Sequence, residues 1–278
     1  MSLAGRVTAL AGLARHRSLE ALHPRGLGGP TVYVSEFPKS GGTWVKEMTR
    51  DLLASSENAA ASPDGRVPAV LHQHWPYAPS LRPAIYVLRD GRDVAVSLYF
   101  HVIRHLRTDT LFSRRARAFC DDVFGPDADP MDTRRNLPAF IRSLSTHPFA
   151  IIVRTRRDHR FQTWPRHVRD WTRRRGVTVV RYERLLTDTP TEIRRIGTAI
   201  GHPISPATSQ DITRRHSFER KTGRTPGTEN PVAFRRKGIA GDWRNHFTAA
   251  AAQAFLEFGG ETLIAMGYEQ DDRWARAL

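Results

Sequence analysis

Residues 31–54 read TVYVSEFPKSGGTWVKEMTRDLLA and contain a strand, a turn and a helix in succession. The segment 31–35 is short, β-branched and apolar, which is typical of a buried strand. The segment 43–54 places its large apolar side chains on one face of a helix. The turn between them, FPKSGG at 37–42, leads into the positive end of that helix. This order predicts the opening of a nucleotide-binding α/β domain.

The turn carries groups that bind phosphate. Gly41 and Gly42 let the backbone approach an anion closely, and Lys39 supplies a mobile cation. In the nucleotide triphosphatase loop, G-x-x-x-x-G-K-[ST], a lysine precedes the final hydroxyl residue. Gly42 stands in that place here, and Glu36 stands in place of the first glycine. The displaced lysine disfavours a magnesium-bound triphosphate, although a turn without any ligand stays open for this loop alone.

The rest of the chain continues to alternate strands with helices. Further buried strands are predicted at 84–88 and 177–181, and helices from about 93 and over 165–175, 190–200 and 248–266. Loops are predicted at 55–69, 121–138 and 221–235. We therefore expect an α/β fold with a central, mostly parallel sheet flanked by helices and a phosphate-binding loop after the first strand. We expect one domain over residues 1–278, with the sequence motifs confined to about residues 31–268.

The composition of the chain limits the cellular locations and the classes of binding partner that we expect. The 278 residues carry a formal net charge of +15, which favours an anionic partner: nucleic acid, a membrane surface or a polyanionic small ligand. Cys120 is the only cysteine, so an internal disulfide and a cysteine metal cluster are excluded and a cytoplasmic location is favoured. No apolar run is long enough to predict a transmembrane helix. The first 16 residues lack a secretory signal, and a helix lying on the domain is favoured over a transit peptide.

Nine arginines lie between residues 154 and 175. They are interpreted as a solvated face or as an attraction for an anionic ligand. Few aromatic residues are interleaved with them, so a nucleic-acid partner is not expected.

Two further segments follow the turn in the chain, YVLRDGRDVAVS at 86–97 and RKGIAGDWR at 236–244. With them, the chain resembles cytosolic-type sulfotransferases that depend on 3′-phosphoadenosine 5′-phosphosulfate (PAPS). Its richness in Arg and Ala favours a bacterial member of that family. The family patterns are Y-P-K-S-G-T-T-W in the first loop and R-K-G-x-x-G-D-W near the C-terminus. Weaker likenesses lie at 164–171, 182–183 and 217–218. The resemblance implies sulfuryl transfer from PAPS, with 3′,5′-adenosine bisphosphate (PAP) as product.

The resemblance also implies which residues bind the donor: Lys39, Ser40, Gly41, Gly42, Thr43, Trp44, Arg89, Ser97, Tyr182, Ser217, Phe218, Arg236, Lys237 and Gly238. A 3′-phosphate needs a cation and a hydroxyl together, and Arg89 with Ser97 supplies that pair. Trp44 and Phe218 would enclose the adenine, while a role for both as core aromatics stays open.

The residues HQHWP at 72–76 match the family pattern K-T-H-[LF]-P, which puts His74 at the catalytic base. His72 stands where the family often has lysine, so either histidine is a candidate and the spacing to Pro76 favours His74. The resemblance gives Lys39 the role of stabilising the charge on the departing phosphate. It also implies that Ser97 holds the Lys39 side chain away until the acceptor arrives. Gly42 replaces the first threonine of the family loop. No metal is expected, since we find no ligand cluster with metal spacing.

The acceptor is expected to be a small molecule, a carbohydrate or a natural product, with its pocket lined by loops at 55–80, 100–140 and 221–235. Two other functions compete with sulfuryl transfer. One is a small-molecule kinase with a phosphate loop, and the other is a non-enzymatic basic module that binds nucleic acid or anionic lipid. The oligomeric state is left open.

Overall fold

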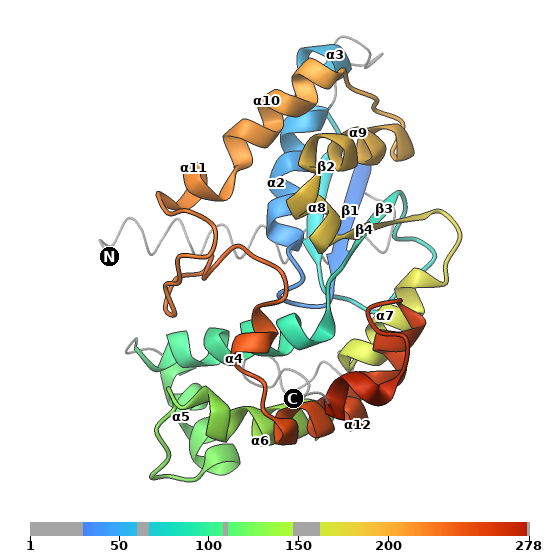
Figure 1. Cartoon of the computed structure of the whole chain (residues 1–278). Helices are drawn as coiled ribbons and strands as arrows, with labels where there is room; N and C mark the ends of the chain where they lie inside the picture. The colour runs from blue at the N-terminus through green and yellow to red at the C-terminus, as the bar shows by residue number, and fades with distance from the viewer. Residues whose placement is uncertain (1–29, 60–66, 108–110, 147–161, 277–278) are drawn as a thin grey trace.

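The computed structural model describes residues 30–59, 67–107, 111–146 and 162–276. The N-terminal helix expected at 1–16 lies outside these residues. The strands are β1 (Thr31–Glu36), β2 (Ala69–Gln73), β3 (Ala84–Leu88) and β4 (Val177–Arg181), all parallel, in the order β2-β1-β3-β4. The helices are α2 (Gly42–Leu53), α3 (Ser56–Ala59), α4 (Gly91–Leu106), α5 (Leu111–Phe124), α6 (Thr133–Thr146), α7 (Trp164–Thr172), α8 (Tyr182–Thr187), α9 (Thr189–Ala199), α10 (Pro206–His216), α11 (Phe218–Thr222) and α12 (Ala249–Ala265), with 3-10 turns η2 (Asp242–Asn245) and η3 (Asp272–Arg276) (Figure 1).

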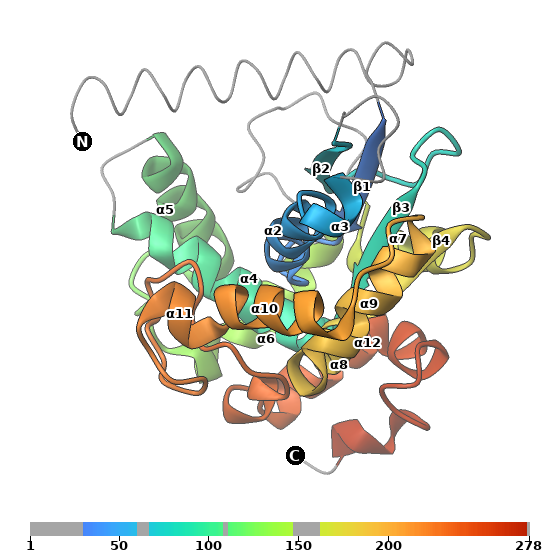
Figure 2. The ribbon, with the colours of Figure 1, turned by 90° about the horizontal axis from the view of Figure 1, so that it is seen from above.

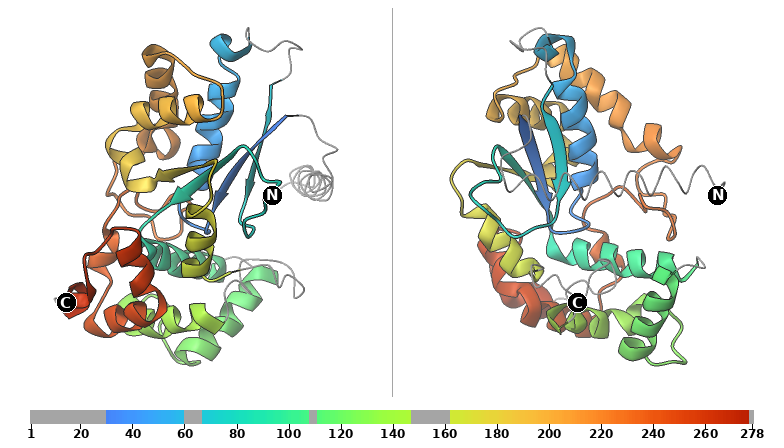
Figure 3. Two further views of the ribbon diagram at one scale, coloured as in Figure 1. Left: turned by 90° about the vertical axis from the view of Figure 1, so that its right-hand side faces the viewer. Right: turned by 180° about the vertical axis from the view of Figure 1, so that it is seen from behind.

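Both faces of the sheet are buried, because its strands are apolar at successive positions. Val34 and Ile85 belong to an apolar cluster with residues of α2, α8, α9 and α10. Tyr86, on the opposite face, belongs to a second cluster with residues of α4, α6, α7 and α12. Figure 2 and Figure 3 show α2, α9 and α10 together on one side of the sheet. The chain thus buries a parallel sheet between two sets of helices.

The order of the strands places a topological switch point at the carboxyl ends of β1 and β3. From β1 the chain passes through α2 to β2 at one edge, and from β3 it passes through α4 to α7 before reaching β4 at the other edge. β1 and β3 are neighbours whose connections leave in opposite directions, which is the place where open α/β sheets bind ligands. Helix α4 runs beneath these strand ends (Figure 1).

The strands at 84–88 and 177–181 have the predicted bounds. Strand β2 was not predicted, because His72 and Gln73 interrupt its apolar pattern. The loop predicted at 121–138 is wrong: α5 continues to Phe124 and α6 begins at Thr133, which leaves only 125–132 irregular. Pro138 lies inside α6, so a proline within this segment is compatible with the helix. The acceptor loop expected at 100–140 is, for the same reason, mostly helical where it is described.

Candidate functional site

Each strand of the sheet delivers a candidate residue at its carboxyl end. Lys39 lies in the turn after β1, Arg89 directly follows β3, and Tyr182 directly follows β4. His74 directly follows β2. Since the strands are parallel, their carboxyl ends meet at one edge, and residues far apart in the sequence converge there.

The turn after β1 has an unusual backbone. Lys39 adopts a left-handed conformation with φ 76°, and Gly41 has φ 107° as it begins α2. Ser40 is buried and its Oγ donates to the Phe37 carbonyl oxygen over 2.7 Å. A Cβ atom on Gly41 would lie 2.7 Å from Cδ2 of Tyr182, so glycine is required by the neighbouring ring as well as by its backbone. The turn therefore presses closely against the end of β4.

Arg89 joins this turn to the C-terminal motif. Its guanidinium donates to the Lys39 carbonyl oxygen (3.1 Å) and to the Ile239 carbonyl oxygen (3.2 Å). It also stacks on the ring of Tyr182, 4.4 Å from the ring centroid. Its Nε is buried and has no hydrogen-bond partner among the described residues. Arg89 therefore holds two chain segments together, and its buried Nε stays available as a donor.

The segment 236–243 is anchored on α4. Both oxygens of Asp93 accept from it, one from the Gly241 amide (2.7 Å) and one from the Trp243 amide (2.9 Å). Asp242 is buried and pairs with Arg236 and with Lys237, whose Nζ lies 2.6 Å from Oδ1. Burial alone would raise the pKa of Asp242, but its bonds to His246, Lys237 and Arg236 hold that pKa well below its usual range.

The predicted adenine residues lie around the turn between α10 and α11. Trp44 packs edge-to-face on Tyr182, with ring centroids 6.1 Å apart, and its Nε1 donates to the His216 carbonyl oxygen over 2.9 Å. Phe218 lies against Gly238, where a Cβ atom would come within 2.4 Å of its ring. Ser217 caps α11 by accepting from the Arg220 amide. The enclosure of adenine by Trp44 and Phe218 stays a prediction.

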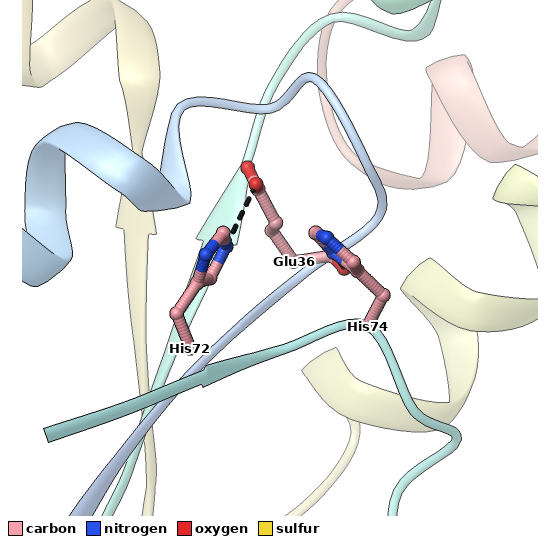
Figure 4. A group of neighbouring side chains, drawn as sticks. All are labelled: Glu36, His72 and His74. Carbon is pink, nitrogen blue, oxygen red and sulfur yellow. Dashed lines mark hydrogen bonds and ion pairs between the residues drawn. The ribbon is translucent and has the colours of Figure 1, made fainter. Parts of the chain in front are cut away.

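Glu36, His72 and His74 form a cluster between the ends of β1 and β2 (Figure 4). The Glu36 carboxylate accepts from His72 Nε2 over 2.9 Å and from the Gly42 amide over 2.5 Å. His74 Nδ1 lies 3.2 Å from the Glu36 carbonyl oxygen, and the two histidine rings are 4.9 Å apart. Burial would raise the pKa of Glu36, but these partners together lower it, so the carboxylate stays charged.

The partner of His74 determines which of its nitrogens is available. A carbonyl oxygen can only accept, so Nδ1 carries the hydrogen and Nε2 keeps its lone pair. Burial and the neighbouring His72 together lower the pKa of His74 to about 4, against the opposing charge of Glu36. His74 is therefore neutral at pH 7, as a general base must be.

Gly42 makes room for the pair of Glu36 and His72. A Cβ atom at this position would lie 2.6 Å from His72 Nε2 and 2.7 Å from Glu36 Cδ. Two of the departures from the family patterns, Gly42 for threonine and His72 for lysine, therefore occur at positions that face each other. Gln73 and Trp75 also differ from the pattern K-T-H-[LF]-P.

The chain just after His74 is fixed by helix α7. The Trp75 carbonyl oxygen accepts from His167 Nε2 (3.0 Å) and from Trp171 Nε1 (2.9 Å). The other nitrogen of His167 bonds to the hydroxyl of Tyr86 over 2.9 Å. Sequence reasoning noted the segment WPRHVRDW at 164–171 only as a weak likeness and missed that it holds the candidate base in place.

The Lys39 side chain extends into a small cavity that Ser97 and Arg236 also line. Its Nζ lies 4.5 Å above the ring centroid of Phe234. Burial lowers the pKa of Lys39 to about 8; the charge of Glu36 opposes this shift, and several arginines add to it. The structure thus brings Lys39 and Ser97 to one cavity, as the resemblance implied.

The cluster of Glu36, His72 and His74 also has the composition of a metal site. One ligand atom from each of the three residues lies within 4.8 Å of the others. The sequence did not reveal this group, because Glu36 lies 36 positions before His72 and only the pairing of β1 with β2 brings them together.

Among the described residues, no helix is long and apolar enough to span a membrane.

Comparison with known proteins supports the sequence interpretation. Residues 82–267 match the model of the sulfotransferase domain, a range that begins after the first loop and after His74. Human Sulfotransferase 2B1 is 23% identical over 264 residues, covering 81% of this chain and 63% of its own length. Bovine Sulfotransferase 1A1 is 27% identical over 272 residues, covering 81% of this chain and 80% of its own. This chain therefore spans somewhat less than two thirds of the human relative.

Solved structures share the fold. Mouse sulfotransferase SULT7A1 complexed with PAP superposes with a TM-score of 0.57 at 18% identity, over 89% of this chain and 87% of its own. Retinol dehydratase in complex with androsterone and inactive cofactor PAP gives a TM-score of 0.53 at 18% identity, over 84% and 80%. Because the family model covers well over half of the residues, the chain belongs to the sulfotransferase domain family.

Proposed function

We propose that the protein transfers the sulfuryl group of PAPS to a hydroxyl or amine of a small-molecule, carbohydrate or natural-product acceptor. The observation that carries this proposal is the bridge made by Arg89 between the Lys39 turn and the segment that contains Arg236. A ligand with two separated phosphate groups can contact both segments at once. Family membership and the PAP present in related structures support the same ligand.

The residues fit such a donor. The unpartnered Nε of Arg89 offers a buried hydrogen-bond donor. The turn ends at the positive end of α2, where the Gly42 amide already donates to a carboxylate, that of Glu36. In our proposal the 5′-phosphosulfate lies against Lys39 to Thr43, and the 3′-phosphate against Arg89, Ser97 and the segment 236–238. Arg236 and Lys237 already pair with Asp242, which orients them, so they would share their hydrogen bonds with the phosphate.

The chemistry needs a base on one side of the sulfur and a cation on the other. His74 Nε2 would take the proton of the acceptor hydroxyl while the acceptor oxygen bonds to sulfur. The bond between sulfur and the phosphate oxygen breaks in the same step, and the Lys39 ammonium stabilises the charge left on PAP. We assign the base to His74 rather than His72, because His72 Nε2 is engaged by Glu36.

We propose that this reaction needs no metal ion, since lysine and arginine side chains supply the positive charge. A transition-metal ion bound by Glu36, His72 and His74 would occupy the lone pair of the base and would inhibit the reaction.

We also propose that the chain forms a single domain. A cytoplasmic location is proposed from the lone cysteine, which is free and buried.

Binding and transfer measurements test the proposal. We expect PAP to bind in the presence of EDTA, and labelled sulfate to pass from PAPS to members of an acceptor library without added metal. Lys39→Ala should weaken both, whereas His74→Ala should keep PAP affinity and lower kcat by about 10²–10⁴. His202→Ala, outside the site, is the matched control. Full activity in both site variants would refute the mechanism, and magnesium-dependent ATP turnover would favour the kinase.

The pH dependence of kcat provides a second test. A base works only when unprotonated, so the rate falls as the pH drops through its pKa. Because the pKa of His74 is lowered to about 4, we expect kcat at saturating donor to stay level down to about pH 5. An acid limb near the ordinary histidine pKa of about 6.5 would contradict this assignment.

A further inference from the structure

Two basic residues lie farther along α4, beyond the part of the site used for the donor. His101 and Arg104 line the same cavity as Lys39 and Ser97. The Arg104 guanidinium donates to His101 Nδ1 over 3.3 Å and lies 5.5 Å from the ring centroid of Phe234, the ring that also faces Lys39. We call His101 and Arg104 the α4 basic pair.

The positive charge of Arg104 is not neutralised by the described part of the chain. No acidic side chain is among the residues that line the cavity. Arg236, at its rim, pairs with Glu229 and Asp242, but Arg104 has no carboxylate within ion-pair distance among the described residues. Burial lowers the pKa of Arg104, and it lowers the pKa of His101, with help from Lys39 and Arg104. The cavity therefore concentrates positive potential without an anion.

The position of the pair separates it from the donor. Ser97 and Arg104 are seven residues apart, so they lie on the same face of α4 and about 10 Å apart along its axis. The donor groups of our proposal lie at the Ser97 end, near Arg89 and the segment 236–238. Arg104 thus lies about two helical turns from Ser97, the α4 residue that we assign to the donor.

The two side chains are suited to an anion. Arginine presents a planar fork of donors that matches a carboxylate, sulfate or phosphate. Because the guanidinium can only donate, His101 Nδ1 accepts and its Nε2 carries a hydrogen that a ligand oxygen can accept. The exposed ring of Phe234 offers an apolar surface between the α4 basic pair and Lys39.

We propose that the natural acceptor is a hydroxylated small molecule with an anionic group, and that Arg104 and His101 bind this group. The inference rests on the proposed sulfotransferase function and names the acceptor class for the same site. The anion lies against Arg104, the apolar body of the acceptor lies against Phe234, and its hydroxyl extends toward His74.

Paired ligands test the proposal by calorimetry on protein saturated with PAP. The probes are 4-hydroxybenzoate, 4-hydroxyphenyl phosphate and the uncharged methyl 4-hydroxybenzoate. We expect at least one anion to bind about tenfold or more tightly than the ester. Arg104→Met should abolish that preference, leave the affinity for the ester unchanged and keep PAP affinity within about twofold. Arg107→Met, one turn away on the exposed end of α4, should behave as the unaltered protein.

Three results would overturn the inference: equal or absent binding of the anions and the ester, an unchanged preference in Arg104→Met, or an equal loss of PAP affinity in that variant. The last would make Arg104 a donor residue. If Arg104→Met unfolds, Arg104→Lys is the alternative. It keeps the positive charge but lacks the planar guanidinium, so it should retain part of the preference for the anionic probes over the ester. Failure of the proposed function looks different, because PAP itself would not bind or no sulfate would leave PAPS.

Discussion

Glu36 places a negative charge beside the turn that we propose to bind the phosphosulfate of the donor. The charge is tolerated because His72 and the Gly42 amide both donate to the carboxylate. The carboxylate in turn holds His72 next to His74 and keeps it from offering its Nε2 as a base. A residue that looks unfavourable for phosphate binding therefore orders the neighbouring histidines.

The contact between positions 42 and 72 can be measured by a double-mutant cycle. Gly42→Thr alone should lower the free energy of unfolding by about 1–3 kcal/mol, because its Cβ enters the space of His72 and Glu36. His72→Lys introduces a flexible end that can turn away, so the double variant should be more stable than additivity predicts by about 0.5 kcal/mol or more. Urea unfolding provides both numbers, and strictly additive losses would show that the two positions are independent.

Lys39 should make PAP binding depend on pH. Its pKa is lowered to about 8 in the free protein, so the ammonium loses its proton as the pH rises through that value. The anionic ligand prefers the protonated form, and PAP affinity should therefore fall above about pH 8, by up to about tenfold per pH unit. Titrations between about pH 6.5 and 9.5 measure this fall, which Lys39→Ala should flatten. A slope that survives in the variant would assign the titration to another group.

At the scale of the element, the segment 236–243 is a loop held by buried acidic residues. Asp93 binds its backbone amides, and Asp242 binds its two cationic side chains. These contacts hold the cations in place before any ligand arrives, which lowers the entropy lost on binding.

Asp242→Asn tests this anchoring. The folded-state pKa of Asp242 is lowered, so its stabilisation is present above the unfolded pKa of about 3.8 and is lost as the pH falls below it. The variant should therefore be less stable at pH 7 by about 3–5 kcal/mol, as expected when a buried ion pair loses one partner. The difference should shrink below about pH 4 in thermal unfolding. A difference that does not change with pH would assign the loss to packing.

Sequence could predict the elements that carry their own signal. The strands at 31–35, 84–88 and 177–181 are β-branched and apolar, and the phosphate turn combines glycines with lysine. Strand β2 was missed because its buried polar residues find partners only after β1 pairs with it: Gln73 donates to the hydroxyl of Ser35. The hydrogen bonds from α7 to the Trp75 carbonyl oxygen were missed for a similar reason, since α7 is about 90 residues away in the chain.

At the scale of the whole molecule, the site lies where the sheet meets the helices beneath it. Arg89 and Asp93, at the junction of β3 with α4, bind chain segments from both ends of the sequence. A ligand that contacts both segments therefore depends on parts of the chain about 200 residues apart. Ligand affinity is therefore coupled to the stability of the complete fold.

PAP should stabilise the protein against heat. At one hundred times its dissociation constant it adds about 2.7 kcal/mol to the free energy of unfolding, which corresponds to roughly 5–10 °C in Tm. The shift should be the same with EDTA as with Mg²⁺, and it should shrink at high salt because a net charge of +15 attracts the ligand. Adenosine 5′-monophosphate, which lacks the 3′-phosphate, is the control. Equal shifts with both nucleotides would contradict the assignment of Arg89 and the segment 236–238.

The two hydrogen bonds from His167 and Trp171 to the Trp75 carbonyl oxygen have a consequence for redesign of acceptor specificity. The imidazole at 74 is braced from the α7 side, whereas the surface with Phe234 and Arg104 belongs to separate parts of the chain. Randomised libraries at 101, 104 and 234 can thus explore new acceptors while the imidazole that we propose as the base keeps its position.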